Sequence, residues 1–267
     1  MRLGILAGQG ALPQMIAAAH PEAVFMHFDG VAVALPENDC LGASFEKFGA
    51  LFDALRDAGV TEVVFAGGLA RPALNPANFD AKMMQLAPGF MAAMKGGDDG
   101  LLRAVIAAFE AEGFKVRGAH ELIDGLTASP GLLAGPEPSE IDRADMARAR
   151  AILDALGPLD VGQGVVVADG QALGVETAQG TDAMLRFVGE TPAALRQSAR
   201  GVFVKAPKPG QDLRVDMPAV GPATIKAAAA AGLAGIVIKA GEVLILEREA
   251  SLRAADEAGI FLLAESG

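Results

Sequence analysis

The feature that most constrains the fold of this chain is the alternation of strand-like and helix-like segments over residues 2–118. The strand-like segments are 2–7, 23–28, 62–66 and 114–118, and the helix-like segments are 12–19, 45–58, 80–95 and 99–112. Strands that are separated by helices of this length are typical of a parallel sheet with helices on its faces. The pattern predicts an N-terminal Rossmann-like parallel α/β domain over residues 1–128.

The second half of the chain has a different rhythm. Residues 129–140 are rich in Pro, Gly and Ser, which predicts a linker. Residues 141–267 are then predicted to form a C-terminal mixed-sheet α/β domain with two hairpins, around Asp169-Gly170 and around Ala240-Gly241. The other elements expected in this half are helices 140–156, 182–187, 222–231 and 250–258, and strands 201–205 and 260–264. A hairpin, a helix and a strand occur twice, either as a degenerate duplication or as ordinary α/β succession.

Composition excludes several classes of function. The net charge of −11 disfavours nucleic-acid binding and broad attachment to anionic lipid. No apolar run has the roughly 18 to 20 residues of a membrane span, the N-terminus has no leader pattern, and there is a single cysteine, which together predict a cytoplasmic protein. The three histidines are scattered without zinc-ligand spacing, and no Ser-His-Asp arrangement is indicated.

A glycine turn joins the first strand to the first helix. Gly8 and Gly10 would let backbone N–H groups approach an anion near Leu12, where the helix begins. Pro13 stands where the third glycine of a dinucleotide fingerprint would be, so this is a weak nicotinamide signature. The turn is therefore either a nucleotide contact or a tight strand-to-helix connection.

Two consecutive acids, Asp98 and Asp99, precede an amphipathic helix. They could cap that helix and favour its dipole. They could also contact a ribose hydroxyl or a phosphate-bound Mg²⁺, because two acids after two glycines exceed what one cap requires.

A polar cluster in the second half includes Glu176 at a strand end and a following helix start. Helix capping explains part of it, and a uracil and ribose pocket would explain all of it. The residues predicted to bind substrate here are Gln163, Thr177, Gly180, Thr181 and Asp182.

The densest charged segment runs from residue 205 to 230. Lys205 and Lys208 bring positive charge into an acidic chain, and Asp212, Arg214 and Asp216 alternate, so that an extended chain would place them on one face. The alternation could be a salt-bridge ladder. Carboxylates beside cations are also the equipment of Mg²⁺-assisted phosphoryl transfer, with Asp212 and Asp216 as tentative ligands.

Six segments, in order over nearly the whole chain, resemble one family. They are AGQGALP, GGDDGLLRAV, LDVGQGVVV, VETAQGTDAML, VKAPKPGQDLRVDMPAVGP and GIVIKAGEVLIL. The family is the LpxI-type UDP-2,3-diacylglucosamine pyrophosphatases. The resemblance implies hydrolysis of this lipid nucleotide to UMP and 2,3-diacylglucosamine 1-phosphate (lipid X) in the lipid A synthesis of Gram-negative bacteria. It also implies Mg²⁺ dependence, substrate held between two domains, a homodimer and transient peripheral contact with the inner membrane.

The chain departs from the family pattern at Ala223, where the resemblance implies Asp between Pro222 and Thr224. An acid there could bind Mg²⁺ or orient the attacking water, whereas alanine can do neither. We therefore expect an impaired enzyme that traps its lipid ligand. The residues expected to be catalytic are Ala223 (as the replaced acid), Asp216, Asp212, Arg214 and Lys205, and Lys208, Gln211 and Thr224 are added to the substrate-binding set.

Two other functions stay open. A non-catalytic protein that binds sugar nucleotides or lipids would agree with Ala223, and a nicotinamide-dependent enzyme would agree with the glycine turn. The acyl chains require apolar surface, for which the methionine-rich segment 79–94 is a candidate. Ordinary core packing is the alternative for that segment.

Overall fold

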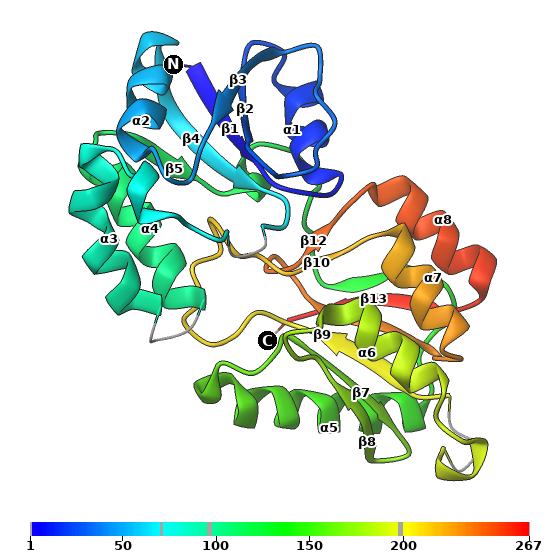
Figure 1. Cartoon of the computed structure of the whole chain (residues 1–267). Helices are drawn as coiled ribbons and strands as arrows, with labels where there is room; N and C mark the ends of the chain where they lie inside the picture. Colours follow the sequence, from blue (N-terminus) through cyan, green and yellow to red (C-terminus); the bar gives the residue numbers. More distant parts are fainter. Residues whose placement is uncertain (1, 70–71, 95–97, 197–199, 267) are drawn as a thin grey trace. The chain divides into compact units, whose positions relative to one another are not determined.

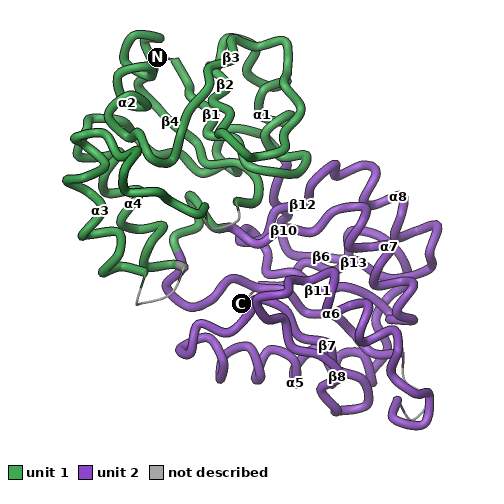
Figure 2. The backbone as a smooth tube through the Cα atoms, in the orientation of Figure 1, with its two compact units in different colours: residues 1–124, 212–216 green, residues 125–211, 217–267 purple. Residues whose placement is uncertain are grey.

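The computed structural model describes residues 2–69, 72–94, 98–196 and 200–266. The chain forms two compact units, coloured separately in Figure 2. Unit 1 comprises Met1–Asp124 together with Asp212–Asp216, and unit 2 comprises Gly125–Gln211 and Met217–Gly267. The chain therefore enters unit 1 a second time within the charged segment.

Unit 1 is built on a parallel sheet. Its strands are β1 (Arg2–Ala7), β2 (Val24–Phe28), β3 (Asp39–Ala43), β4 (Val60–Ala66) and β5 (Lys115–Arg117). Their order is β3-β2-β1-β4-β5, and every pair is parallel. This confirms the predicted parallel α/β fold. The sequence did not predict β3, because the edge strand DCLGA is short and mostly outside the core.

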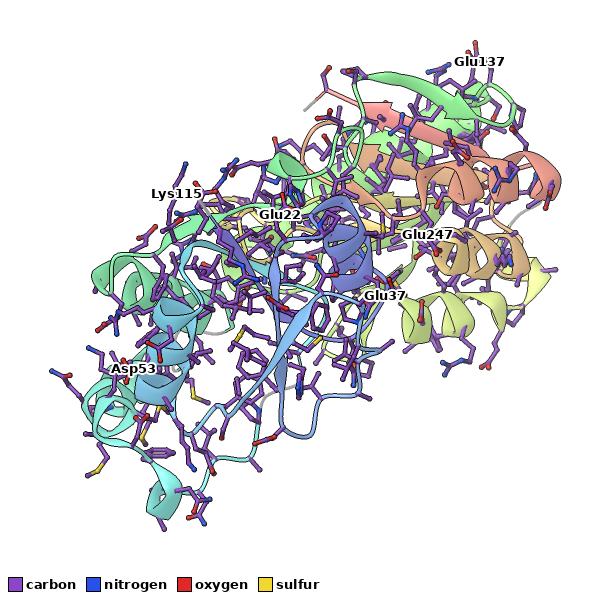
Figure 3. All side chains as sticks on the ribbon, turned by 90° about the horizontal axis from the view of Figure 1, so that it is seen from above. Glu22, Glu37, Asp53, Lys115, Glu137 and Glu247 are labelled. Carbon is purple, nitrogen blue, oxygen red and sulfur yellow. The ribbon has the colours of Figure 1, made fainter. Side chains whose placement is uncertain are left out.

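Helices cover both faces of this sheet (Figure 1). They are α1 (Leu12–Ala19), α2 (Phe48–Asp57), α3 (Ala81–Met94) and α4 (Asp98–Ala111), with short 3₁₀ turns at Pro76–Asn78 and Ala119–Glu121. Phe52 of α2 packs edge-to-face against Phe48 and Phe109, which anchors α2 to α4 in one apolar cluster. Asp53 and Lys115, labelled in Figure 3, have mostly exposed side chains at the surface of this unit.

Unit 2 contains a mixed sheet. Its strands are β6 (Gly131–Ala134), β7 (Gly164–Ala168), β8 (Gln171–Val175), β9 (Val202–Lys205), β11 (Gly235–Lys239) and β13 (Phe261–Glu265), in the order β6-β13-β11-β9-β7-β8. The pairs β13–β11 and β11–β9 are parallel, and the other pairs are antiparallel. The mixed sheet agrees with the predicted class. A separate parallel pair joins β10 (Ala219–Val220) to β12 (Leu244–Ile245).

Helices again lie on both faces of the sheet in unit 2 (Figure 1). They are α5 (Glu140–Leu156), α6 (Gly180–Gly189), α7 (Pro222–Ala230) and α8 (Arg248–Ala258), with 3₁₀ turns at Gly157–Leu159 and Ala193–Leu195. Along β7, Val165 and Val167 pack in the cluster that contains α5 residues, whereas Val166 packs in the cluster that contains α6, α7 and α8 residues. This two-residue alternation is the expected pattern of a strand buried on both sides.

Two predictions for unit 2 differ from the structure. Residues 129–140 are not simply a linker, because β6 lies within them and pairs with β13; Glu137, labelled in Figure 3, also pairs with Arg143 of α5. The second hairpin is wrong. The chain turns at Gly241, and Leu244 then donates its N–H to Pro218 O, so the following strand pairs with β10 instead of β11. Without that hairpin, the apparent duplication is also lost.

The first hairpin is confirmed, and a residue that the sequence analysis did not single out supports it. Asp169 and Gly170 both have positive φ between β7 and β8, as a two-residue turn requires. Asp145 of α5 is buried, and its carboxylate accepts hydrogen bonds from the N–H groups of both turn residues, at 2.9 and 2.7 Å.

In unit 1, the loops after β1 and β4 are bonded to each other. Gly8 donates its N–H to Ala66 O at 2.7 Å, and Gln9 and Gly68 exchange backbone hydrogen bonds at 2.8 and 2.9 Å. A Cβ on Gly8 would lie 2.6 Å from Gly68 O, so the loops can approach this closely only because Gly8 has no side chain.

We expect Gly8→Ala to destabilise unit 1 by about 1 to 3 kcal/mol, because the added methyl group overpacks the two loops. Gly68→Ala is the matched control, since a Cβ there meets nothing within 4 Å and φ at Gly68 is not positive. Thermal unfolding of both variants measures the difference. Equal melting temperatures would contradict the role given to Gly8.

Candidate functional site

The predicted site residues divide between the two units. Unit 1 holds Gly8, Gly10, Leu12, Asp98, Asp99, Asp212, Arg214 and Asp216. Unit 2 holds Gln163, Thr177, Gly180, Thr181, Asp182, Lys205, Lys208, Gln211, Ala223 and Thr224. The charged segment that is continuous in sequence therefore contributes side chains to both units.

In unit 2, a buried lysine is the centre of the polar cluster. Lys205 ends β9, and only 7% of its side chain is exposed. Its Nζ donates a hydrogen bond to Thr181 Oγ1 at 2.7 Å, and Thr181 Oγ1 in turn lies 2.6 Å from Glu176 Oε1. Lys205 Nζ is also 3.9 Å from Glu176 Oε1. The structure thus brings the predicted Lys205 and Thr181 together, along with a carboxylate that compensates the buried charge.

A second polar network lies beside the end of β9. Gln163 donates its side-chain N–H to Gln211 Oε1 at 2.9 Å, and the same oxygen accepts the N–H of Lys208 at 2.9 Å. Gln163 O also accepts the N–H of Ala206 at 3.0 Å. The Lys208 ammonium pairs with Asp160. Gln163, Lys208 and Gln211, which were predicted separately, therefore form one connected group.

Two helix starts complete the predicted set in unit 2. Gly180 opens α6 with φ of +82°, Asp182 is exposed in its first turn, and Thr177 bonds to the neighbouring Gln179. In the first turn of α7, Ala223 is exposed and Thr224 is half-buried. An acidic side chain at position 223 would have open space and a favourable helix N-terminus.

In unit 1, the glycine turn has a packing role. The Gly8 N–H is engaged by Ala66 O, so Gly8 serves the tight connection that was left open as an alternative to an anion contact. Leu12 is buried in the core, and Gly10 has φ of +100° with open space around its Cα. Asp99 pairs with Arg103 of the same helix at 2.7 Å. The side chain of Asp98, the first residue of α4, lies outside the described part of the structure.

Residues 212–216 form a turn, so the prediction of an extended chain with one charged face is wrong. The N–H groups of Val215 and Asp216 both donate to Asp212 O at 3.2 Å, and Asp212 Oδ1 accepts the N–H of Arg214 at 3.0 Å. Aspartate favours such a turn because its side chain bonds to the backbone two residues on.

The Arg214 side chain is committed to ion pairs. It contacts Asp212 through Nε at 3.0 Å and Nη2 at 2.7 Å, and Glu110 of α4 through Nη1 at 2.7 Å. The bonds from Arg214 hold the pKa of the Asp212 carboxyl below its ordinary value. The bonds to Asp212 and to Glu110 raise the pKa of Arg214. The geometry favours the salt-bridge alternative for Arg214 and Asp212.

This arrangement does not fit Asp212 as a metal ligand. Both of its carboxylate oxygens accept hydrogen bonds from the Arg214 guanidinium. A metal ion bound to Asp212 would therefore be repelled by the positive charge of Arg214. Across the described residues, no group of three His, Cys, Asp or Glu side chains is placed to hold a metal ion. Mg²⁺ usually needs only one or two protein carboxylates when phosphates supply the other ligands. A single carboxylate can therefore suffice, and Asp216 remains a predicted Mg²⁺ ligand.

Comparison with known proteins identifies the family. The family model of the LpxI N-terminal domain matches residues 2–126, and that of the LpxI C-terminal domain matches residues 129–263. The chain belongs to the LpxI family. It is 42% identical over 271 aligned residues to the UDP-2,3-diacylglucosamine pyrophosphatase LpxI of Caulobacter vibrioides, an alignment that covers 98% of this chain and 96% of the relative.

Three acidic partners in this LpxI-family chain were not among the predicted site residues. Glu176 lies next to predicted residues, and its position at a strand end was a usable signal. Glu110 and Asp160 carry no such signal, because Arg214 and Lys208 reach them across 104 and 48 residues of sequence.

In the described part of this chain, no helix is both long and apolar enough to span a membrane.

The Asp212–Arg214 pair predicts a pH-dependent stability. The folded-state pKa of Asp212 lies below its unfolded value of about 3.9, so the pair stabilises unit 1 above that pH, and this stabilisation is lost as pH falls through the folded-state pKa. We expect Asp212→Asn to lower the free energy of unfolding by about 1 kcal/mol at pH 7 and by much less at pH 3. Urea unfolding at both pH values measures this. If the free energy of unfolding fell equally at both pH values, the effect would come from packing and the predicted ionic contribution would be contradicted.

Proposed function

We propose that this chain hydrolyses the pyrophosphate bond of UDP-2,3-diacylglucosamine, giving UMP and 2,3-diacylglucosamine 1-phosphate, as a step of lipid A synthesis. The observation that carries the proposal is the 42% identity to the Caulobacter pyrophosphatase over nearly the whole length of both proteins. In this reaction, water adds to one phosphorus, the bond from that phosphorus to the bridging oxygen breaks, and the water proton passes to a base.

The chemistry of unit 2 supports this proposal. The substrate carries negative charge on both phosphates, and that charge increases on the bridging oxygen as the bond breaks. A lysine ammonium in a buried setting interacts with such charge more strongly than it would in water. We assign this role to Lys205, with Lys208 and the amides of Gln163 and Gln211 as neighbouring polar groups.

Mg²⁺, a homodimer and transient contact with the cytoplasmic face of the inner membrane belong to the proposal through the family resemblance alone. When bound, Mg²⁺ would neutralise phosphate charge and polarise the phosphoryl group. Asp212 would not hold this ion, because both of its carboxylate oxygens are bonded to Arg214.

The proposal also assigns a defect to position 223. Ala223 is exposed in the first turn of α7, where the family resemblance implies an aspartate. A carboxylate in that position could take the proton of the attacking water or orient it, and its loss should slow the chemical step more than it weakens binding. The chain as it stands would then hold substrate and hydrolyse it slowly.

We expect Ala223→Asp to raise the rate of UMP release from UDP-2,3-diacylglucosamine by about 10² to 10⁴-fold, the usual contribution of a general base. The assay is run with Mg²⁺ and with a chelator, and UMP is quantified by chromatography. Ala223→Asn is the matched control, because it has nearly the same shape as aspartate without the charge.

An Ala223→Asp chain that is no faster than the parent chain would contradict the defect assigned to this position. If neither chain releases UMP but both bind the lipid nucleotide, the protein is a non-catalytic binder, which was the alternative left open by the sequence.

A candidate surface for the acyl part of the substrate lies on α3. The side chains of this helix divide sharply, because Met83 and Phe90 are buried whereas Met84 and Met91 are 64% and 68% exposed. Core packing therefore explains only part of the methionine-rich segment. Met94 is also exposed, and the exposed side of α3 carries no charged residue between Met84 and Met94. Such a face suits contact with lipid chains.

We expect Met84→Glu and Met91→Glu to lower kcat/KM for UDP-2,3-diacylglucosamine in lipid vesicles by about tenfold or more, because a buried charge opposes lipid contact. Their melting temperatures should stay near that of the parent chain, since both positions are exposed. Gln85→Glu adds the same charge at a neighbouring position and should have a smaller effect. Activity unchanged by either methionine variant would exclude this face.

A further inference from the structure

Glu176 is the group in unit 2 that ordinary packing explains least. Its side chain is only 13% exposed, and its Oε2 is buried without a hydrogen-bond partner among the described residues. An unpartnered buried carboxylate oxygen costs free energy, so a carboxylate retained in this setting requires a reason. Oε1 provides one, because it is bonded to the hydroxyl group that contacts Lys205.

The strands place Glu176 and Lys205 on either side of a glycine. Lys205 of β9 pairs directly with Gly164 of β7, and Glu176 follows the end of β8 and donates its N–H to Gly164 O at 2.8 Å. Directly opposed residues of antiparallel strands have their side chains on one face. The Glu176 and Lys205 side chains can therefore meet over Gly164, which has none.

Gly164 must be glycine for this meeting. A Cβ on Gly164 would lie 2.8 Å from Glu176 Oε2 and 2.6 Å from the Phe203 ring. Gly162 is constrained in the same way, because it has φ of +60° and a Cβ there would lie 2.0 Å from Glu176 O. Both glycines of the segment VGQGVVV thus make room for Glu176, which gives this motif a physical meaning that its sequence alone did not.

The directions of the hydrogen bonds in this group are fixed by chemistry. A lysine ammonium can only donate, and an ionised glutamate can only accept. The single Thr181 proton must therefore point to Glu176 Oε1, and Thr181 Oγ1 accepts from Lys205 Nζ. While it is bonded to Glu176, Thr181 does not donate this proton to a substrate, and its hydroxyl oxygen keeps one lone pair that can still accept.

We propose that Glu176 is a positioning residue that acts through the Thr181 hydroxyl to hold the Lys205 ammonium where it binds the phosphates of the nucleotide substrate. This inference rests on the proposed function. Lysine has a flexible four-carbon stem, so a fixed ammonium requires partners that limit its rotamers. Glu176 and Thr181 supply that constraint, and the negative charge of Glu176 compensates the buried positive charge.

The test is the binding of UDP, measured by titration calorimetry on the folded full-length chain. We expect Glu176→Gln and Thr181→Val each to weaken UDP binding by roughly tenfold, equivalent to about 1.4 kcal/mol. Thr181→Ser keeps the hydroxyl and should bind within about twofold of the parent chain, which a purely steric role of Thr181 would not predict. Glu190→Gln, at the exposed end of α6, removes the same charge outside the cluster and should leave binding unchanged.

A double-mutant cycle separates positioning from general damage. If Glu176 acts through Lys205, then Glu176→Gln should cause no further loss in a Lys205→Met background, whereas additive losses would overturn the inference. Should Glu176→Gln fail to fold, the same cycle is measured with Thr181→Val, and with Thr181→Ser as its control, in the parent chain and in the Lys205→Met background. Thr181→Val should then cause no further loss of UDP binding in the Lys205→Met background.

The outcome also separates this inference from the proposed function. UDP binding by the parent chain that Glu176→Gln and Thr181→Val both leave unchanged would overturn the positioning role and leave the proposed function intact. A parent chain that does not bind UDP at all would overturn the proposed function, and the inference with it.

Discussion

The chemistry of unit 2 depends on the burial of one ammonium group. Lys205 lies at the end of a strand whose other residues are apolar and buried, a position where an uncompensated charge would be expensive. Glu176 compensates the charge through Thr181, and the glycines on β7 and before it make room for that carboxylate. Gly162 and Gly164 are therefore required where they stand, because a Cβ on either would collide with Glu176.

Glycine serves close approach in both units. In unit 1, Gly8 allows the loops after β1 and β4 to share backbone hydrogen bonds, and in unit 2, Gly164 allows two charged side chains to meet above a strand. The two cases differ in consequence. At Gly8, the backbone N–H groups are bonded within the fold. At Gly164, the glycine allows Glu176 and Lys205, which carry opposite charges, to lie close together. A glycine motif therefore has no fixed meaning until the atoms that approach it are known.

Local patterns predicted most of the fold, because periodicity and turn residues act over short distances. The segments 2–7, 12–19 and 140–156 were predicted with the bounds that the structure has. Strand β3 was missed because it is a short edge strand mostly outside the core, and strand β6 and the partner of β12 were missed because their pairing depends on residues far away in sequence. For the same reason, the sequence did not indicate that Arg214 pairs with Glu110, which lies 104 residues away.

We infer that the buried Lys205 ammonium binds a substrate phosphate in this LpxI-family hydrolase. A crystal structure of this chain with UMP bound tests it most directly. We expect a phosphate oxygen within hydrogen-bond distance of Lys205 Nζ, with the contacts from Lys205 to Thr181 and from Thr181 to Glu176 preserved. A UMP phosphate bound away from Lys205 Nζ would contradict it.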